Sequence, residues 1–137
     1  MKKIHVTHID TGGHGYYSVS KKDILLLGIK NAITRFSGHN LTRVYLEEDQ
    51  DGILLYNAAK AIGYEIICKS GYNLKFNITH NYNAGYFSWQ PIINDVVYIH
   101  EKRYVISHID AKRIIVVNEN DTAYKIPLSN PFKYINI

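Results

Sequence analysis

The sequence predicts an α+β fold in two parts that are joined by an aromatic connector, residues 71–91. Over residues 1–70, short β-branched segments alternate with two segments of helical spacing, which indicates a small β-β-α-β-β-α-β module. Over residues 92–137, strand-like segments recur about every ten residues, which is typical of a meander that curls into a small β-barrel. The chain of 137 residues is long enough for one compact domain or two small modules.

The module begins with two strands around a glycine-rich turn. Residues 4–9 alternate in the manner of a half-buried strand, and residues 16–19 are the next strand candidate. Residues 10–15 carry three glycines, which adopt backbone angles that other residues resist. We therefore expect a turn between the two strands.

A short helix is expected over residues 21–27. Ser20 precedes it as an N-cap, and Asp23 stands at the third helical position as an acidic capping partner. Gly28 follows as the residue that ends the helix.

The rest of the module contains more strands and a second helix. Extended segments are expected at residues 31–36 and 41–47, with a turn at residues 37–40 between them. Residues 50–62 approximate helical spacing, and residues 64–70 read as a final strand.

The connector is too aromatic for a solvated linker. Residues 72–89 contain six large aromatic side chains, which would be costly to leave in water. We expect some of them to pack between the two modules. The surplus, with Tyr82, Tyr86 and Trp89 as the first choices, is expected to form an exposed patch for a partner or for a second copy of the chain in a homodimer.

The C-terminal part is expected to contain five short strands separated by turn residues. The expected strands are residues 95–100, 103–109, 113–117, 123–127 and 132–135. Apolar residues occupy both faces of these strands, so one face is expected to rest on the first module.

Two segments of this part resemble the opening of KOW and other SH3-like barrels. The segments are residues 94–99 and 102–109, and Asn94 stands where those barrels usually have a glycine. The turn between them also lacks the usual glycine and has Glu101-Lys102 instead. The resemblance implies an SH3-like β-barrel, a fold whose members often bind nucleic acid or protein.

The first half resembles short uncharacterised proteins of phage genomes. The shared features are Asp-x-Gly-x-Gly-His-Gly-aromatic at residues 10–16 and Tyr-Leu-Glu-Glu-Asp at residues 45–49. The abundance of Ile, Asn, Lys and Tyr, which AT-rich codons encode, points the same way. The resemblance implies a phage protein and transfers no catalytic residue.

Charge, apolar content and cysteine content limit which classes of protein the chain can belong to. The net charge is +4, and the longest apolar run is residues 24–29, far shorter than the roughly 18 residues of a membrane helix. The start lacks the apolar segment of a secretory signal, so we expect no membrane association and a location in the host cytoplasm. Cys68 is the single cysteine, so an internal disulfide and a Cys-based zinc cluster are excluded. Its apolar neighbours indicate a small core residue.

The cluster most suggestive of metal chemistry lies near the N-terminus. His5, His8, Asp10 and His14 are residue types that bind zinc or iron. His5 and His8 would point to opposite faces of a strand, so they cannot both face one ion without a bulge. We therefore expect no metal and no other cofactor, with these four residues as the only weak ligand candidates.

An acidic run precedes the second helix. It contains Glu47, Glu48, Asp49 and Asp51. Negative charge is favoured at a helix N-terminus. We therefore expect Asp49 to cap the second helix and the other acidic residues of the run to stabilise its N-terminus. A protein-docking role is the alternative.

Basic pairs fall at two turns of the C-terminal part. Lys102-Arg103 and Lys112-Arg113 stand about ten residues apart, and we expect them to face one way. Tyr104 lies beside the first pair as a ring for stacking on bases. Solvated loop charges are the alternative interpretation.

These features favour a small non-catalytic phage accessory protein that binds nucleic acid or a host nucleic-acid-processing complex. The alternative is a protein inhibitor of a host enzyme or defence system, an anti-defence or host-takeover factor. A metal-dependent hydrolase ranks third. Salt dependence separates the first two, because phosphate contacts weaken steeply as salt rises.

Overall fold

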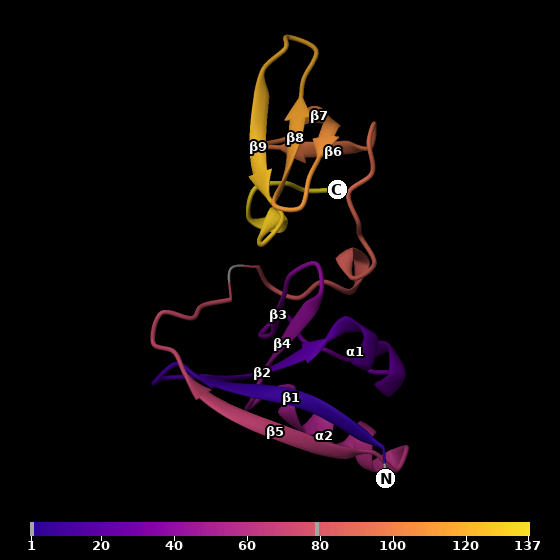
Figure 1. Ribbon diagram of the computed structural model, residues 1–137, viewed down its shortest axis with the longest axis vertical. Coiled ribbons are helices and arrows are strands. Elements are labelled where there is room, and N and C mark those ends of the chain that lie inside the picture. The colour runs from indigo at the N-terminus through magenta and orange to yellow at the C-terminus, as the bar shows by residue number, and fades with distance from the viewer. Residues whose placement is uncertain (1, 79) are drawn as a thin grey trace. The chain divides into compact units, whose positions relative to one another are not determined.

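The computed structural model describes residues 2–78 and 80–137 (Figure 1). The chain divides into two compact units, unit 1 (Met1–Phe87) and unit 2 (Ser88–Ile137), so the boundary falls inside the expected connector. The structure is mixed α and β, with two α-helices and two sheets in the described part of the chain. None of these helices combines the length and apolarity that a membrane span requires.

Unit 1 is built on a five-stranded sheet. Its elements are β1 (Lys3–Asp10), β2 (Gly15–Ser20), α1 (Lys21–Leu27), β3 (Gly38–His39), β4 (Arg43–Glu47), α2 (Gly52–Ala61) and β5 (Glu65–Tyr72). The strand order is β3-β4-β2-β1-β5. The pair β1–β5 is parallel, whereas β1–β2, β2–β4 and β3–β4 are antiparallel.

Local sequence signals place α1 as expected. The Ser20 hydroxyl accepts a hydrogen bond from the Asp23 N–H at 3.1 Å, which confirms the N-cap. Gly28 ends the helix with φ of 71°, a left-handed conformation that favours glycine.

The expected strand at residues 31–36 is wrong. That segment is a loop, and the two-residue strand Gly38–His39 lies where a turn was expected. Long-range contacts override the local pattern. Gly38 lies so close to Ile78 that a Cβ would come within 2.7 Å of the Ile78 side chain, and Gly38 also forms an isolated bridge with Asn81.

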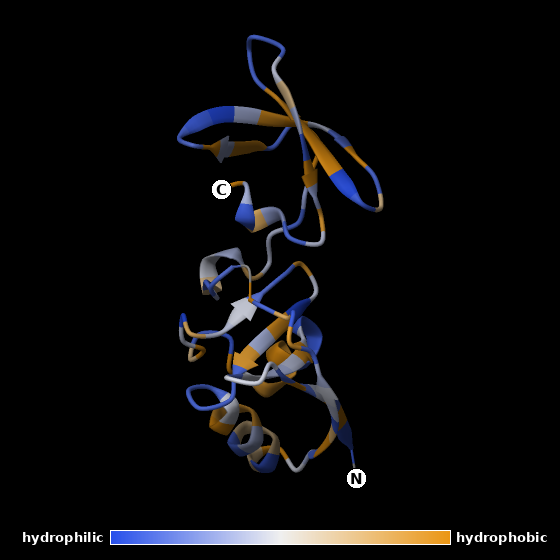
Figure 2. Ribbon diagram, turned by 90° about the vertical axis from the view of Figure 1, so that its left-hand side faces the viewer, coloured by the Kyte–Doolittle hydropathy of each residue, from blue (hydrophilic) through white to orange (hydrophobic). Residues whose placement is uncertain are grey.

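One face of the unit 1 sheet carries the core. Inward side chains of β1, β2 and β4 pack with α1, α2 and two aromatic residues of the connector, because alternate residues of a strand point to opposite faces. Figure 2 shows hydrophobic and hydrophilic residues mixed along the same chain segments. The main buried members are Ile4, Val6, Val19, Ile24, Leu27, Val44, Leu46, Leu55, Ala59, Tyr82 and Phe87.

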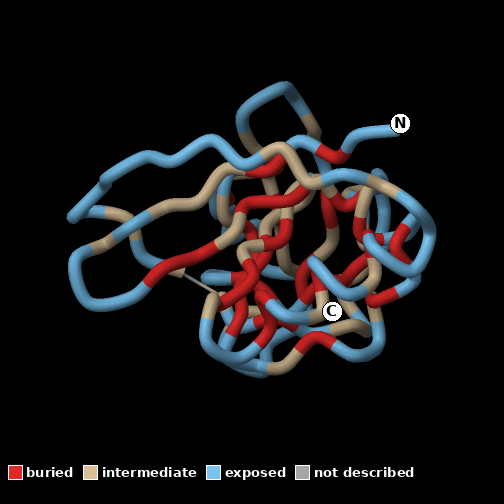
Figure 3. The backbone as a smooth tube through the Cα atoms, turned by 90° about the horizontal axis from the view of Figure 1, so that it is seen from below, coloured by how far each residue is buried: buried red, intermediate tan, exposed pale blue. Residues whose placement is uncertain are grey.

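Unit 2 is an antiparallel meander. Its strands are β6 (Val96–Ile99), β7 (Lys102–Ile109), β8 (Arg113–Val117) and β9 (Ala123–Pro127), in the order β6-β7-β8-β9. Short 3₁₀ helices occur at η1 (Ala84–Tyr86), in unit 1, and at η2 (Pro131–Lys133), in unit 2. Figure 3 marks the buried residues in red along the backbone tube. The buried core of unit 2 contains Val97, Tyr104, Ile106, Ile114, Val116, Ile126 and Ile135.

The expected closed barrel is wrong, because this sheet is open. The segment expected as the fifth strand turns into η2, with Pro131 at the start of the helix. Among the described residues, a single isolated bridge, Tyr98 with Asn136, pairs the C-terminal segment with β6. Without a fifth strand of useful length, nothing in the described chain hydrogen-bonds β9 back to β6.

Candidate functional site

The two basic pairs flank strand β7. The turn before it contains His100 and Glu101, whose φ values of 48° and 68° give the two-residue hairpin turn that matches strand twist. Lys102 and Arg103 begin β7, and Lys112 and Arg113 follow the turn at its other end.

Each basic pair lines its own hollow in unit 2. Lys102 and Arg103 line a hollow of about 610 Å³ together with Val117 and Asn118. Lys112 and Arg113 line a second hollow of about 300 Å³ together with Lys125. No pattern in the sequence indicates Lys125, because its place near Arg113 depends on the pairing of β8 with β9.

Arg103 of the first pair and Arg113 of the second lie on one face of the sheet but at opposite ends of it, whereas Lys102 precedes Arg103 in β7 and therefore points to the other face. Val105 pairs with Val117, and Arg103 and Arg113 extend from that point in opposite directions. At about 3.3 Å per residue, the two arginines are roughly 20 Å apart along the strands. Successive turns of a meander necessarily fall at opposite ends, so the pairs frame a strip and do not form one cluster.

Tyr104 is not part of this face, and its expected role in base stacking is wrong. Only 4% of its surface is exposed, and its ring packs edge-on against Tyr124 at 5.6 Å. Neighbouring residues of a strand point to opposite faces, so Arg103 and Tyr104 cannot both face outward. Tyr98, which pairs with Arg103 across the hairpin, is the outward aromatic residue and is 40% exposed.

Acidic groups accompany the basic strip. Asp110 accepts hydrogen bonds from the backbone N–H groups of Lys112 (2.8 Å) and Arg113 (3.0 Å), and the first of these is the main cause that lowers the Asp110 pKa. Its carboxylate also lies 3.9 Å from the Arg113 Nε and 3.8 Å from the His108 Nε2. Glu119 lines the larger hollow. Asp110 thus fixes the turn that presents the second basic pair.

The four weak metal candidates do not converge. His8 and Asp10 share a face of β1 and His5 lies on the other, because strand residues alternate. Asp10 accepts a hydrogen bond from the Gly12 N–H at 2.8 Å, and His14 is exposed in the turn. Within residues 2–78 and 80–137, no three His, Cys, Asp or Glu side chains are placed to hold a metal ion together.

His8 has a different partner, which no pattern in the sequence indicates. Its Nε2 lies 2.7 Å from a carboxylate oxygen of Glu48, and its ring lies 4.9 Å from that of Tyr17. Forty positions separate His8 from Glu48, so only the pairing of β1, β2 and β4 brings them together. Cys68, expected in the core, is exposed on the edge strand β5.

The acidic run is divided among separate tasks. Buried Glu47 accepts hydrogen bonds from the N–H groups of Asp49 and Gln50, at 3.1 and 2.9 Å. The expected cap by Asp49 is wrong, because α2 begins later, after Asp51. Asp51 is fully buried and makes no cap either; it accepts hydrogen bonds from the Thr34 N–H and from the hydroxyls of Thr34 and Ser37.

The connector aromatics are divided between the two cores. Tyr82, expected on the surface, is 6% exposed and donates its hydroxyl to the Lys30 carbonyl. Tyr86 is half-buried and stacks on His80 at 6.1 Å. Trp89 is half-buried against Phe132 of unit 2 at 5.3 Å. The most exposed large hydrophobic residues of this region are instead Tyr72 and Leu74, at 67% and 66%.

Two buried basic side chains lie beneath the connector in unit 1. The Lys21 Nζ donates to the Phe87 carbonyl at 2.8 Å, and burial lowers the Lys21 pKa to about 8. Burial, with further contributions from Lys21 and His80, lowers the pKa of His39 to about 3, so His39 is neutral at pH 7. The His39 ring lies 5.4 Å from that of His80 and 5.3 Å from that of Tyr82.

Comparison with known proteins adds no relative. No protein-family model matches the chain, and no curated protein and no solved structure is significantly similar to it.

Proposed function

We propose that this protein binds nucleic acid through the outer face of its unit 2 sheet. The observation that carries the proposal is a basic strip: Arg103, Arg113 and Lys125 lie on that face, and Lys102 and Lys112 line the hollows at its two ends. Cations arranged along a path release counterions when they meet a phosphate backbone, which is the main source of sequence-independent affinity. The protein acts by binding, as a small accessory protein of a phage, and not by catalysis.

The spacing of the strip favours a backbone that runs along the sheet. Roughly 20 Å separates Arg103 from Arg113, a length that takes several consecutive phosphates. Tyr98 offers a ring beside Arg103, and a ring stacks on any base. We therefore expect little sequence preference and a strong dependence on salt.

A titration with labelled oligonucleotides tests the proposal. Fluorescence anisotropy at about 50 mM salt is measured for the wild type and for two double variants, Lys102→Glu/Arg103→Glu and Lys112→Glu/Arg113→Glu. Each double reversal is expected to weaken binding at least tenfold and to lower the salt slope by about two, because two phosphate contacts are lost.

The matched control reverses two lysines elsewhere. Lys22 and Lys60 are exposed on the two helices of unit 1, and Lys22→Glu/Lys60→Glu changes the net charge by the same amount. Circular dichroism shows that each variant is folded. A wild type that binds nothing at low salt, or a control that loses as much affinity as the double variants, contradicts the proposal.

A second candidate is a protein inhibitor that covers its target. Tyr72 and Leu74 are exposed and lie over Gly12, where a Cβ would meet the Leu74 side chain at 3.1 Å and the Tyr72 hydroxyl at 3.6 Å. Exposed apolar side chains that gather in one place are typical of interfaces. A partner captured by the wild type, but not by Tyr72→Ser/Leu74→Ser, with affinity that is insensitive to salt and unaffected by nuclease, favours this candidate.

A further inference from the structure

The unit 1 sheet has one face that its helices leave uncovered. The core residues of β1, β2 and β4 all point to the face where α1 and α2 pack. The alternate residues, among them His5, Thr7, Ser18, Arg43 and Lys69, point the other way. Four of them, His5, Thr7, Arg43 and Lys69, line a hollow of about 560 Å³ together with Val6, Ile67 and Cys68.

Two cations flank the middle of this open face. One row across the sheet runs from Lys69 on β5 through Thr7 and Ser18 to Tyr45 on β4. The Arg43 guanidinium reaches toward this row, because its Nε donates to the Ser18 hydroxyl at 2.6 Å and its Nη2 donates to the Ser18 carbonyl at 3.0 Å. These bonds hold the guanidinium in place while leaving other N–H groups for a ligand.

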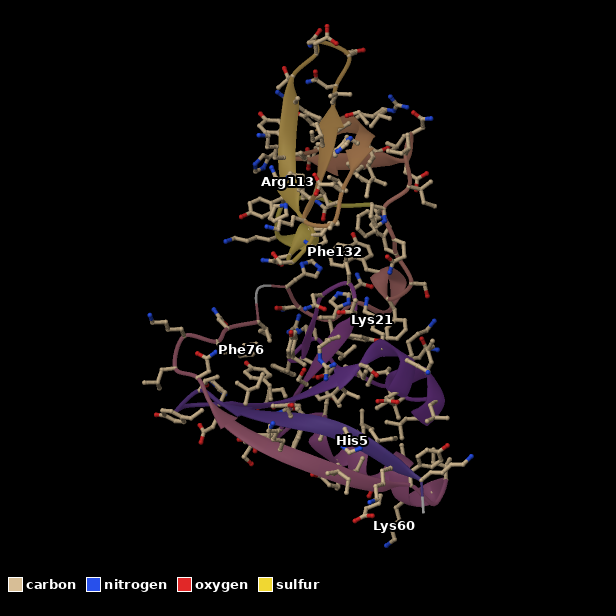
Figure 4. All side chains as sticks on the ribbon, viewed as in Figure 1. His5, Lys21, Lys60, Phe76, Arg113 and Phe132 are labelled. Carbon is tan, nitrogen blue, oxygen red and sulfur yellow. The ribbon has the colours of Figure 1, made fainter. Side chains whose placement is uncertain are left out.

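An aromatic group borders the cations. The Phe76 ring lies 5.5 Å from that of Tyr16 and 5.0 Å from that of Tyr45. Tyr16 is buried, whereas Tyr45 and Phe76 remain half-exposed. Figure 4 labels His5 on β1 and Phe76 on the segment that follows β5. The open face therefore combines cations, hydroxyls and partly exposed rings.

Acidic groups on this face do not cancel the cations. Glu65 pairs in register with Lys3 at the end of the β1–β5 ladder, away from Arg43 and Lys69. The other acidic residue, Glu47, is buried and accepts hydrogen bonds from two backbone N–H groups. The middle of the face, around Thr7 and Ser18, is thus lined by basic and neutral side chains.

We propose that this open face binds a segment of single-stranded nucleic acid. Arg43 and Lys69 would take phosphate oxygens, Thr7 and His5 would donate or accept hydrogen bonds, and a base would stack on Phe76. A flat sheet with rings and cations suits unstacked bases, because a duplex keeps the faces of its bases hidden. Three strand intervals of about 4.8 Å separate β5 from β4, so the face spans roughly 14 Å, enough for two or three nucleotides.

This site shares no residue with the basic strip of unit 2, so the two proposals fail separately. The test is an NMR titration of the full ¹⁵N-labelled chain with an oligothymidine of roughly eight nucleotides. The amides of Thr7, Ser18 and Lys69 are expected to shift, whereas the amides of α2 stay. Shifts confined to residues 88–137 overturn this inference and leave the proposed function standing. Shifts confined to unit 1 support this inference and contradict the proposed function of the unit 2 strip.

Variants and competing ligands sharpen the test. Lys69→Glu, an exposed position, is expected to weaken the unit 1 shifts at least fivefold without changing those of unit 2. Arg43→Gln, a second variant, is expected to act in the same direction, and Lys60→Glu on α2 is the control that changes neither. Equal unit 1 shifts with a duplex or with thymidine monophosphate would overturn the proposal, because the face would then recognise phosphate alone.

Discussion

The two units of this protein bury different kinds of side chain. In the described part of the chain, every buried polar or charged side chain belongs to unit 1; these are Ser18, Lys21, Ser37, His39, Glu47 and Asp51. The core of unit 2 is aliphatic apart from Tyr104 and Phe132. Arg103, Arg113 and Lys125 of unit 2 lie instead on the outer face of its sheet.

The difference follows from how each sheet is connected. Unit 2 is a meander in which each strand pairs with the next through a short turn. Its backbone N–H and C=O groups therefore hydrogen-bond to one another, and the core needs only apolar side chains. Unit 1 has irregular segments that cross its core, and their N–H groups need partners. Asp51 supplies them for the loop at residues 29–37, and Lys21 satisfies the Phe87 carbonyl in the connector. Buried charge in unit 1 therefore holds irregular chain in place.

The largest effect is expected from the buried carboxylate. Asp51→Ala leaves the Thr34 N–H and the hydroxyls of Thr34 and Ser37 without their acceptor, which costs about 4 kcal/mol. Hydrogen exchange of the β4 amides measures the loss. Asp49→Ala, in the same acidic run but exposed, is the control and should cost less than about 0.5 kcal/mol. Similar costs for both variants would show that the network does not stabilise unit 1.

A slightly smaller effect is expected in the apolar core of unit 2. Ile114 is fully buried, and Ile114→Ala is expected to lower the free energy of unfolding by about 3 kcal/mol. Urea unfolding followed by Trp89 fluorescence measures it, because the Trp89 ring packs against Phe132 in this unit. Ile115→Ala, one position further on the outer face, should cost about 1 kcal/mol. A larger loss at Ile115 would mean that the two faces are assigned the wrong way round.

The smallest of the three effects depends on pH. Burial lowers the His39 pKa to about 3, below the ordinary 6.5 that it regains on unfolding, so the unfolded chain binds more protons between these values. Stability is therefore complete above pH 6.5 and falls as the pH drops, by about 2 kcal/mol between pH 6.5 and 5. The Lys21 ammonium and the His80 and Tyr82 rings face the same imidazole.

The comparison with His39→Phe isolates this contribution. Hydrogen exchange of the β1 amides at both pH values gives the free energy of opening of unit 1 for each protein. The phenylalanine variant has no imidazole to protonate. The difference in free energy of opening between the two proteins should therefore change by about 2 kcal/mol between pH 6.5 and 5. A gap that does not change with pH would show that His39 titrates alike in the folded and unfolded chains.

Local signals predicted the elements whose causes are local. Ser20, Asp23 and Gly28 fix α1 within a few residues, and the turns of unit 2 follow from short polar segments. The strand expected at residues 31–36 failed because contacts from Asp51 hold that segment as a loop. The fifth barrel strand failed because Pro131 starts a 3₁₀ turn.

The candidate sites divide in the same way. The sequence by itself placed the basic pairs beside turns, since charge and turn residues are read along the chain. Strand alternation, also a sequence property, would have separated Arg103 from Tyr104. Only the tertiary structure decided that Lys125 joins Arg113, that Glu48 meets His8, and that Arg43 and Lys69 flank an open sheet face. The physical reason is that cross-strand pairing sets these distances, and the order of strands in a sheet depends on how the whole core packs.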